Sequence, residues 1–443
     1  MTRNILLERS RNALAVGTAV AFLSVATPRR GQAEDYLESK VMYYLEDGDR
    51  IKVFSPVISY QAELSSTLSI KIDGIYNSIS GATPTGAPPG SDGSASGSAG
   101  RNALTLKPGA SPAAYPHYSG ASPSPAPAPT PAPDPTPVYV PDPTPSPSSS
   151  APAPSPEPAE EEVPASGKVP TSTFDDERYA GNVEVTKRIN NHAVSGLLSY
   201  STESDYDSLG LAVRDAVDFN QKNTTLLFGG AYTHDRVDPA NGTPSGDKDL
   251  VDVMAGLTQV LDPRTLFTVN LTLGLADGLL SDPYKVVELN GDLVAESRPE
   301  TKDKQIVMAT LAHYFPSVAG SAEGSYRFYN DSFGIQAHTV QLAWYQKLGP
   351  NWIVRPLVRY YDQGAADFYG VRFSGSPDHY SSDYRVSALT ALGYGLKVAW
   401  KPNARIQLDA SVERYEQSGK DSETPEDVYP SATYVILGAR LWL

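Results

Sequence analysis

The 443-residue sequence contains no cysteine, which excludes disulfides, thiolate nucleophiles and cysteine-based zinc sites. Basic residues are fewer than acidic ones, 36 against 51, and the formal net charge is −15. This balance argues against nucleic acid as a partner, because a protein that binds phosphates needs a basic face. Beyond the extreme N-terminus there is no apolar run of about 18 residues, the length expected of a membrane-spanning helix. A membrane-spanning strand would not be detected in this way, since it shows only alternating hydrophobicity.

The N-terminus has the composition of a secretory signal peptide. Arg3, Arg9 and Arg11 form a positively charged segment, and an apolar segment follows at 13–26. Gly31-Gln32-Ala33 then offers small residues for cleavage. We therefore predict a signal peptide over residues 1–33 and a mature protein in the cell envelope or outside the cell. An uncleaved N-terminal helix is the alternative.

A long insertion is predicted at residues 79–173. More than half of the 38 prolines fall within 81–170, and Ala, Ser, Gly and Thr make up most of the remainder. Such a composition does not bury a core, and alternating prolines favour extended polyproline II. We interpret the segment as a disordered loop insertion, with a stalk or spacer as the alternative. Residues 34–78 would then hold the first strands of the folded body, and residues 174–443 the remainder.

The folded body alternates between apolar and polar residues. In 267–276 every second residue from Phe267 to Leu275 is apolar, and the residues between them are mostly polar or small. In 386–400 the pattern places Val386, Leu392 and Trp400 on one face and Lys397 on the other. A period of two is typical of a strand. By this pattern the strands have roughly 10 to 15 residues, which suits a tilted membrane-spanning strand better than a soluble one.

The connections between these strands alternate in length. About 16 strands can be placed, with 12 or 14 as alternatives, and from the fourth strand onward short links follow even strands and long links follow odd strands. The link near residues 46–49 is short and does not fit. Short periplasmic turns and long extracellular loops are typical of outer-membrane barrels. We therefore predict an all-β fold, a transmembrane antiparallel β-barrel in which the insertion follows the third strand.

Two groups of residues are expected at defined places in this barrel. Tryptophans near short links would lie at the periplasmic membrane interface, which amphipathic rings prefer: Trp344, Trp352, Trp400 and Trp442. Charged residues opposite the apolar faces would line the lumen: Glu184, Arg188, Arg355, Arg359, Lys397, Arg405, Asp409 and Glu413. These charges could set solute selectivity or form an internal salt-bridge network in a blocked barrel.

Several longer motifs resemble a known bacterial family. They include the segments 218–225 (DFNQKNTT), 280–285 (LSDPYK), 313–316 (HYFP) and 365–369 (AADFY). Together with similar segments over most of 175–443 and part of 40–82, they resemble the family called domain of unknown function 3570. The resemblance implies an outer-membrane β-barrel, and it implies no activity and no catalytic residue. The Pro-rich insertion has no counterpart in the resemblance.

These observations favour a passive pore, or the outer-membrane component of an envelope system, in a Gram-negative bacterium. The alternative is a non-conducting structural or assembly barrel that engages a partner through its Pro-rich segment. A hydrolase with its site at the rim is the least favoured, so we predict no enzyme, no cofactor and no metal site. The acidic loop residues Glu203, Asp205 and Asp207 are interpreted as solvated charge rather than as ligands of a divalent ion. Expected partners are membrane lipid, lipopolysaccharide, the barrel-insertion machinery and an unidentified periplasmic protein.

Overall fold

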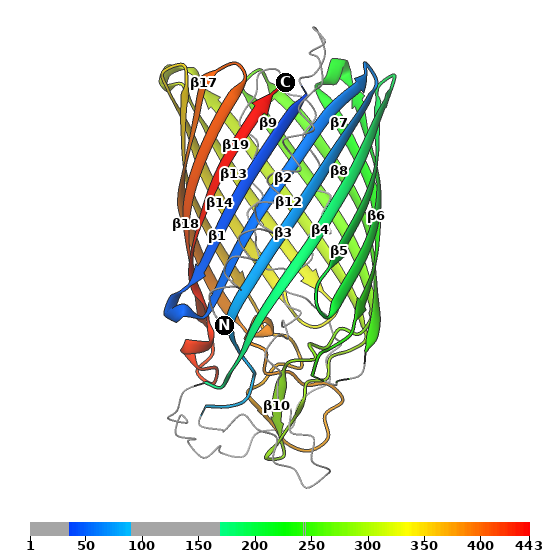
Figure 1. The fold of residues 1–443 in the computed structure, drawn as a ribbon, viewed down its shortest axis with the longest axis vertical. Coiled ribbons are helices and arrows are strands. Elements are labelled where there is room, and N and C mark those ends of the chain that lie inside the picture. Colours follow the sequence, from blue (N-terminus) through cyan, green and yellow to red (C-terminus); the bar gives the residue numbers. More distant parts are fainter. Residues whose placement is uncertain (1–34, 90–168, 242, 244) are drawn as a thin grey trace, which may run out of the picture.

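The computed structural model describes residues 35–89, 169–241, 243 and 245–443. The predicted signal peptide and residues 90–168 of the predicted insertion lie outside this part of the chain. The described residues form one closed barrel of sixteen antiparallel strands (Figure 1), which confirms the predicted fold and the higher of the predicted strand counts. The barrel closes where β1 pairs with β19, from Tyr36 opposite Trp442 to Glu46 opposite Ala432.

The barrel strands have 11 to 19 residues, more than the 9 to 11 or so that a tilted strand needs to cross a bilayer. In chain order they are β1 (Tyr36–Glu46), β2 (Ile51–Ser65), β3 (Leu68–Pro84), β4 (Thr171–Ile189), β5 (His192–Thr202), β6 (Tyr206–Phe219), β7 (Thr224–Val237), β8 (Gly246–Asp262), β9 (Thr265–Gly278), β12 (Thr301–Phe315), β13 (Gly320–Asp331), β14 (Gln336–Leu348), β15 (Trp352–Gln363), β17 (Leu389–Asn403), β18 (Ile406–Gly419) and β19 (Ser431–Trp442).

The remaining elements are short. A small sheet consists of β10 (Val286–Leu289), β11 (Asp292–Ala295) and β16 (Arg372–Phe373), which the sequence pattern did not reveal. Five 3-10 turns complete the list: η1 (Asp47–Asp49), η2 (Asn220–Lys222), η3 (Pro316–Val318), η4 (Tyr384–Val386) and η5 (Glu426–Val428). None of the helices within the described residues is long or apolar enough to cross a membrane.

The alternation read from the sequence separates the two faces of the barrel. On β9, Leu271, Leu273 and Leu275 are exposed on the outer face. On β15, Tyr360 is 48% exposed while the next residue, Tyr361, is only 6% exposed. Large apolar side chains on the outside of a closed sheet are unfavourable in water. They are stabilised by contact with the acyl chains of a membrane. The outer face is thus that of a membrane barrel.

The two ends of the barrel differ in the length of their links. At the turn end, which is at the top in Figure 1, the links are two to four residues long: 66–67, 190–191, 220–223, 263–264, 316–319, 349–351 and 404–405. At the loop end, at the bottom in Figure 1, the links are 47–50, 85–170, 203–205, 238–245, 279–300, 332–335, 364–388 and 420–430. The link 47–50 remains an exception to the expected alternation in length, and the loop-end links 203–205 and 332–335 are as short as the turns.

Two boundaries differ from the prediction. The last residues of β3 and the first of β4 enter the range assigned to the insertion, because their backbones pair from Ile79 opposite Asp176 to Pro84 opposite Thr171. The strand pattern placed at 386–400 begins only at Leu389. The expected face of Val386 was wrong: this residue ends η4, and its side chain is buried in a core at the loop end rather than exposed to lipid.

Candidate functional site

The lumen is lined by charged side chains that meet in pairs across neighbouring strands. On β17 and β18, Lys397 Nζ lies 3.2 Å from Asp409 Oδ2. Arg355 of β15 lies 3.8 Å from Glu413 of β18, two strands away, which places both side chains inside the barrel. All four residues are among those expected to line the lumen, and each is buried.

The other lumen candidates occupy different positions along the barrel. Arg214 of β6 donates to Glu184 of β4 at 2.6 Å, across the intervening strand β5. Arg359 donates to Gln341 Oε1 at 2.6 and 3.0 Å. Arg188 is closer to the turn end and lies 3.2 Å from Glu63. Arg405 is exposed in the turn between β17 and β18, so it lies at the rim rather than on the lumen wall.

Further pairs that sequence reasoning did not include extend this pattern around the lumen. Lys304 lies 3.0 Å from Asp252, and both Lys40 and Arg440 contact Glu38, at 3.1 and 3.2 Å. Opposite charges in contact cancel locally, so the wall presents a mixed rather than a single-signed field. Only the register of neighbouring strands decides which charges meet, and that register was not readable from the sequence.

Aromatic side chains mark two levels on the outer face. At the turn end, Trp352 and Trp400 stack on neighbouring strands with ring centroids 5.5 Å apart, and both are exposed. Trp344 is nearby, and its ring centroid lies 5.7 Å from that of Phe315. Toward the loop end, exposed tyrosines occupy five strands: Tyr200, Tyr232, Tyr326, Tyr360 and Tyr394. Two such girdles are the expected positions of membrane–water interfaces.

Trp442 differs from the other three tryptophans. It shares the side of β19 that carries Arg440, whereas Leu441 is exposed on the opposite side. Lys401 Nζ lies 4.1 Å from its ring centroid, and Arg440 Cζ lies 5.8 Å from it. Its ring therefore contacts two cationic side chains at the turn-end rim.

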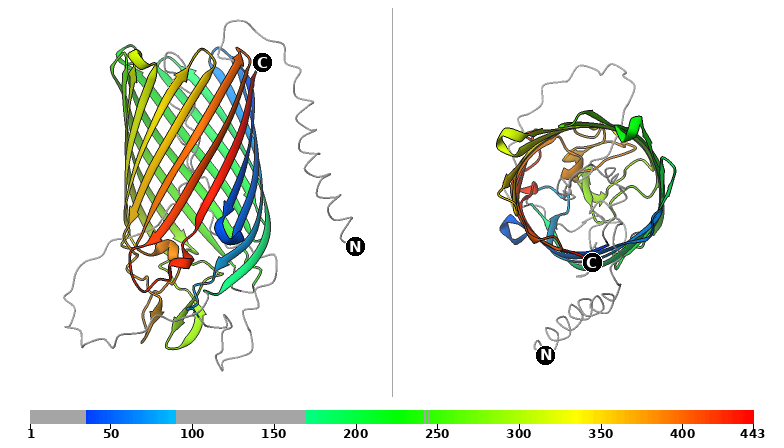
Figure 2. Two further views of the ribbon diagram at one scale, coloured as in Figure 1. Left: turned by 90° about the vertical axis from the view of Figure 1, so that its left-hand side faces the viewer. Right: turned by 90° about the horizontal axis from the view of Figure 1, so that it is seen from above.

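The loop end is narrowed by long loops that fold across it. Viewed along the barrel axis in Figure 2, segments of the loops lie within the outline of the strands. The loops 364–388 and 420–430 pack against inward side chains of β13 to β17 and form a hydrophobic core, which we call the loop core: Tyr329, Phe333, Ile335, Ala337, Tyr361, Ala366, Phe368, Val386, Leu389, Ala391, Val428 and Tyr429. Apolar side chains on the inner face at this level thus contact protein instead of water.

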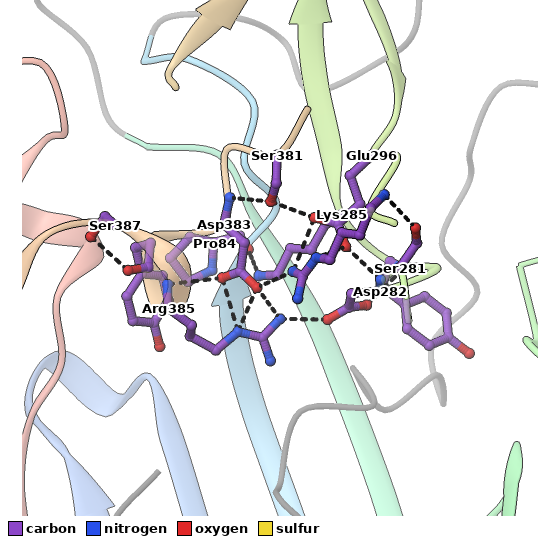
Figure 3. Close-up of polar contacts among 12 residues, drawn as sticks. Pro84, Ser281, Asp282, Lys285, Glu296, Ser381, Asp383, Arg385 and Ser387 are labelled. Carbon is purple, nitrogen blue, oxygen red and sulfur yellow. Dashed lines mark hydrogen bonds and ion pairs between the residues drawn. The ribbon is translucent and has the colours of Figure 1, made fainter. Parts of the chain in front are cut away.

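A largely buried group of ions connects the loop 364–388 to the loop 279–300 (Figure 3). This mouth cluster consists of three anions and three cations from the loops 279–300 and 364–388: Asp282, Lys285, Glu296, Arg298, Asp383 and Arg385. Asp383 is its centre, because Arg385 Nε donates to both of its oxygens at 2.9 and 2.7 Å and Arg298 donates at 2.8 Å. Arg385 also reaches Asp282 at 2.6 Å.

The mouth cluster also connects the loops to the base of the insertion. Lys285 is fully buried and donates from Nζ to the carbonyl oxygen of Pro84, the last residue of β3. Val286 N donates to Thr85 O at 2.9 Å, and Thr85 N donates to Pro170 O at 3.0 Å. The insertion therefore leaves and re-enters the barrel at one place, beside the loop 279–300.

The charges of the mouth cluster are mutually dependent. Burial alone would raise the pKa of Asp383, but Arg385, Lys285 and Arg298 together lower it well below its usual value. Burial lowers the pKa of Lys285, and the attraction of Asp383 opposes this effect. A buried ion that loses its partners is strongly unfavourable, so these side chains hold the two loops together as a unit.

Sequence reasoning singled out the segment 280–285 for its resemblance to a family, but not for its ions. Contacts of the cluster join distant positions: Arg298 and Asp383 are 85 residues apart, and Asp282 and Arg385 are 103 apart. Charged residues in a long loop read as solvated in a sequence. No local signal distinguishes them from buried ones.

A closed barrel with an apolar outer face, two aromatic girdles and a charged lumen is a β-barrel of the outer-membrane type. The chain belongs to the family described as Protein of unknown function (DUF3570), whose model matches residues 12–247 and 241–438. This confirms the resemblance seen in the sequence. A comparison with curated proteins gave no match.

Solved structures similar to this chain are outer-membrane barrels of differing roles. The siderophore receptor PirA from Pseudomonas aeruginosa is 10% identical with a TM-score of 0.39; the match covers 88% of this chain and 57% of the receptor. A bacterial polysaccharide outer membrane secretin is 9% identical (TM-score 0.43; 93% and 99% covered). The CymD monoaromatic hydrocarbon channel is 9% identical (TM-score 0.40; 94% and 90% covered). Similarity of this order does not carry a function from one barrel to another.

Proposed function

We propose that this protein is a passive pore in the outer membrane of a Gram-negative bacterium, narrowed at its loop end by a fixed constriction. The observation that carries the proposal is the polar lumen wall of a closed barrel of sixteen strands, with Lys397, Asp409 and Arg355 turned inward. A barrel of about this strand number has room for water inside. Other inward charges stay partly exposed, such as Glu184, and favour a hydrated lumen, since dry charges would be costly.

The proposed solutes are ions and small hydrophilic molecules that move down their concentration gradients. The loop core and the mouth cluster reduce the opening at the loop end, so a small conductance is expected for a barrel of this size. The paired charges of the wall favour weak selectivity, because neither sign dominates the field that a passing ion meets.

Single-channel recording in planar lipid bilayers tests this proposal. The wild type is expected to give discrete conductance steps. Arg355→Glu combined with Arg359→Glu is expected to shift the reversal potential toward cation selectivity, because two lumen cations become anions. Arg236→Glu on the exposed side of β7 makes the same kind of charge change outside the lumen, and it is expected to leave selectivity unchanged.

Reversing the charge of Arg355 beside Glu413 could prevent folding. Arg359→Gln is a milder variant, because Arg359 donates to a neutral side chain, that of Gln341. Each variant is checked for the heat-modifiable electrophoretic mobility of a folded barrel. Inserted, folded wild type without conductance would eliminate the pore.

The second candidate is a non-conducting structural or assembly barrel. The loop core and the mouth cluster favour it, because both hold protein in the opening. Its partner would be engaged through the Pro-rich segment, whose two ends meet at the loop end at Thr85 and Pro170. Asp383→Ala distinguishes the two candidates: a variant that conducts more than the wild type supports a narrowed pore, whereas silence of both proteins supports the structural barrel.

A further inference from the structure

Three carboxylates from two segments meet at the loop end and are distinct from the ions of the mouth cluster. Asp176 comes from β4, near the base of the insertion, and Glu203 and Asp205 come from the link between β5 and β6. One oxygen of each lies within 4.8 Å of one oxygen of each of the others. Asp176 is 4% exposed and Asp205 is 3% exposed, so two of the three are nearly inaccessible to bulk water.

Two oxygens of this group are buried and accept no hydrogen bond within the described residues: Oδ2 of Asp176 and Oδ1 of Asp205. The second oxygen of each carboxylate is already engaged, since Asp176 Oδ1 accepts from the backbone N–H of Glu177 at 2.9 Å and Asp205 Oδ2 accepts from the Tyr284 hydroxyl. A buried carboxylate oxygen without a donor is costly. Among the described residues, these two oxygens therefore face one another's carboxylates without a donor.

Within the part of the chain that the structure describes, the ion pairs at these anions supply little positive charge. Arg178 contacts the group, with its Nε 3.5 Å from Glu203, but one guanidinium does not balance three carboxylates. Buried carboxylates with so little opposing charge are costly as anions, and a cation between them would offset that cost.

We propose that Asp176, Glu203 and Asp205 form a binding site for a divalent cation, with Ca²⁺ as the ion that fits best. All three ligands are carboxylates, the hard oxygen donors that Ca²⁺ takes, and Ca²⁺ accepts irregular arrangements of six to eight such oxygens. Mg²⁺ requires near-ideal octahedral geometry, which a group drawn from two separate segments does not provide as readily. An open pocket beside the site, lined by Glu203, Ser204 and Thr202 among others, gives water access to complete the coordination shell.

The bound ion would stabilise three loops together. Asp205 accepts from Tyr284 of the loop 279–300, and its backbone carbonyl accepts from Asp238 N of the loop 238–245 at 2.8 Å. Tyr284 directly precedes Lys285 of the mouth cluster. Ca²⁺ at this site would thus hold the link 203–205 against the same loop that narrows the opening, independently of whether the barrel conducts.

The structure also offers a matched control. Asp207 is two residues beyond Asp205, but it lies on the exposed side of β6, where the Tyr200 hydroxyl donates to it at 3.0 Å. Asp207→Asn therefore removes the same charge from the same segment without touching the site. The sequence had grouped Asp207 with Glu203 and Asp205, and the structure places Asp176 there in its stead.

The test is calorimetric titration of CaCl₂ into the detergent-folded full barrel, stripped with EDTA and buffered at pH 8. The wild type is expected to bind one Ca²⁺ with a dissociation constant of about 0.1–1 mM, as in extracellular modules. Asp176→Asn and Glu203→Gln are each expected to weaken binding at least tenfold, and Asp207→Asn should bind as the wild type does.

A second measurement follows Tb³⁺, whose luminescence is sensitised by nearby tyrosine such as Tyr284. Displacement of Tb³⁺ by Ca²⁺ in the wild type and in Asp207→Asn, but not in Asp176→Asn, would support the site. Heat-modifiable mobility confirms that each variant is folded. Absence of Ca²⁺ binding by folded wild type would overturn the proposal and would leave a shared proton as the group between the carboxylates. An equal loss of Ca²⁺ affinity in Asp207→Asn and Asp176→Asn would also overturn it.

Discussion

The turn end and the loop end join the same sixteen strands by different means. At the turn end each link has two to four residues, and its conformation is set by its own backbone. Asn190, for example, adopts a positive φ of 56°. At the loop end the links are held by contacts between distant segments, such as Arg298 with Asp383 and Phe333 with Phe368. Local chain chemistry therefore shapes one end, and tertiary packing shapes the other.

The difference has a consequence for energetics. A residue in a short turn affects mainly its own hairpin, so a substitution there should have a small effect. A buried ion or core side chain at the loop end supports several loops at once, and its loss should be large but confined to that end. Four substitutions test this contrast, from the largest expected effect to the smallest.

Asp383→Ala should have the largest effect. It leaves Arg298 and Arg385 without their central anion, at a cost of about 3–5 kcal/mol for a broken buried pair. Hydrogen–deuterium exchange should rise sharply in 364–388 and 279–300 while the strands stay protected. Unchanged exchange in both loops would mean that the mouth cluster does not hold them.

Ile335→Ala should destabilise the loop core by about 2–5 kcal/mol, because Ile335 is fully buried there and truncation leaves a cavity. The milder variant Ile335→Val should cost about 0.5–1.5 kcal/mol. Opening free energies from hydrogen exchange in the loops 332–335 and 364–388 give both values. Equal effects of the two variants would indicate that the loop core is loosely packed.

Gln221→Gly should stabilise the turn end, by about 1 kcal/mol. Gln221 is the middle of three consecutive residues with positive φ, at 49°, 57° and 70°, a conformation that side chains disfavour and glycine accepts. Asn190→Gly is the comparison, and its gain should be smaller because asparagine tolerates this conformation. Equilibrium unfolding in urea measures both, and a destabilised Gln221→Gly barrel would contradict the account of the turn.

Asp362→Asn should have the smallest effect, although it also removes a charge at the loop end. Asp362 pairs with Lys420 at 2.9 Å, but both side chains are about one-third exposed. Pairs in such surroundings contribute about 0.2–1 kcal/mol. Hydrogen exchange in 364–388 should barely change; a loss comparable to that of Asp383→Ala would show that burial is not what separates the two aspartates.

Much of the barrel was predictable because strand alternation is a local property. The alternation from Phe267 to Leu275 predicted a strand, and these residues lie in β9. The lumen side of Lys397 and Glu413 followed from the same period of two. The prediction failed where a distant contact overrides the local pattern: Val386 was expected on a strand, but the neighbouring Arg385 donates to Asp282 in another loop and the chain forms η4 instead.

The acidic residues illustrate the same limit. Glu203, Asp205 and Asp207 are close in sequence, but the strand alternation turns Asp207 outward, and the third carboxylate, Asp176, comes from β4. Neither the register of β4 nor the position of the 203–205 link can be read from the local sequence. Trp442 likewise shares the level of Trp400 but not its environment.

The sequence by itself determined the period of the strands, the face on which most of their side chains lie and a strand number of about 16. These depend on residue order alone, because neighbouring side chains in a strand point to opposite sides. Only the tertiary structure decided which charges meet in the lumen, how the loops close over one end and where three carboxylates converge. Those outcomes depend on strand register and on contacts between segments far apart in the chain, which no local pattern encodes.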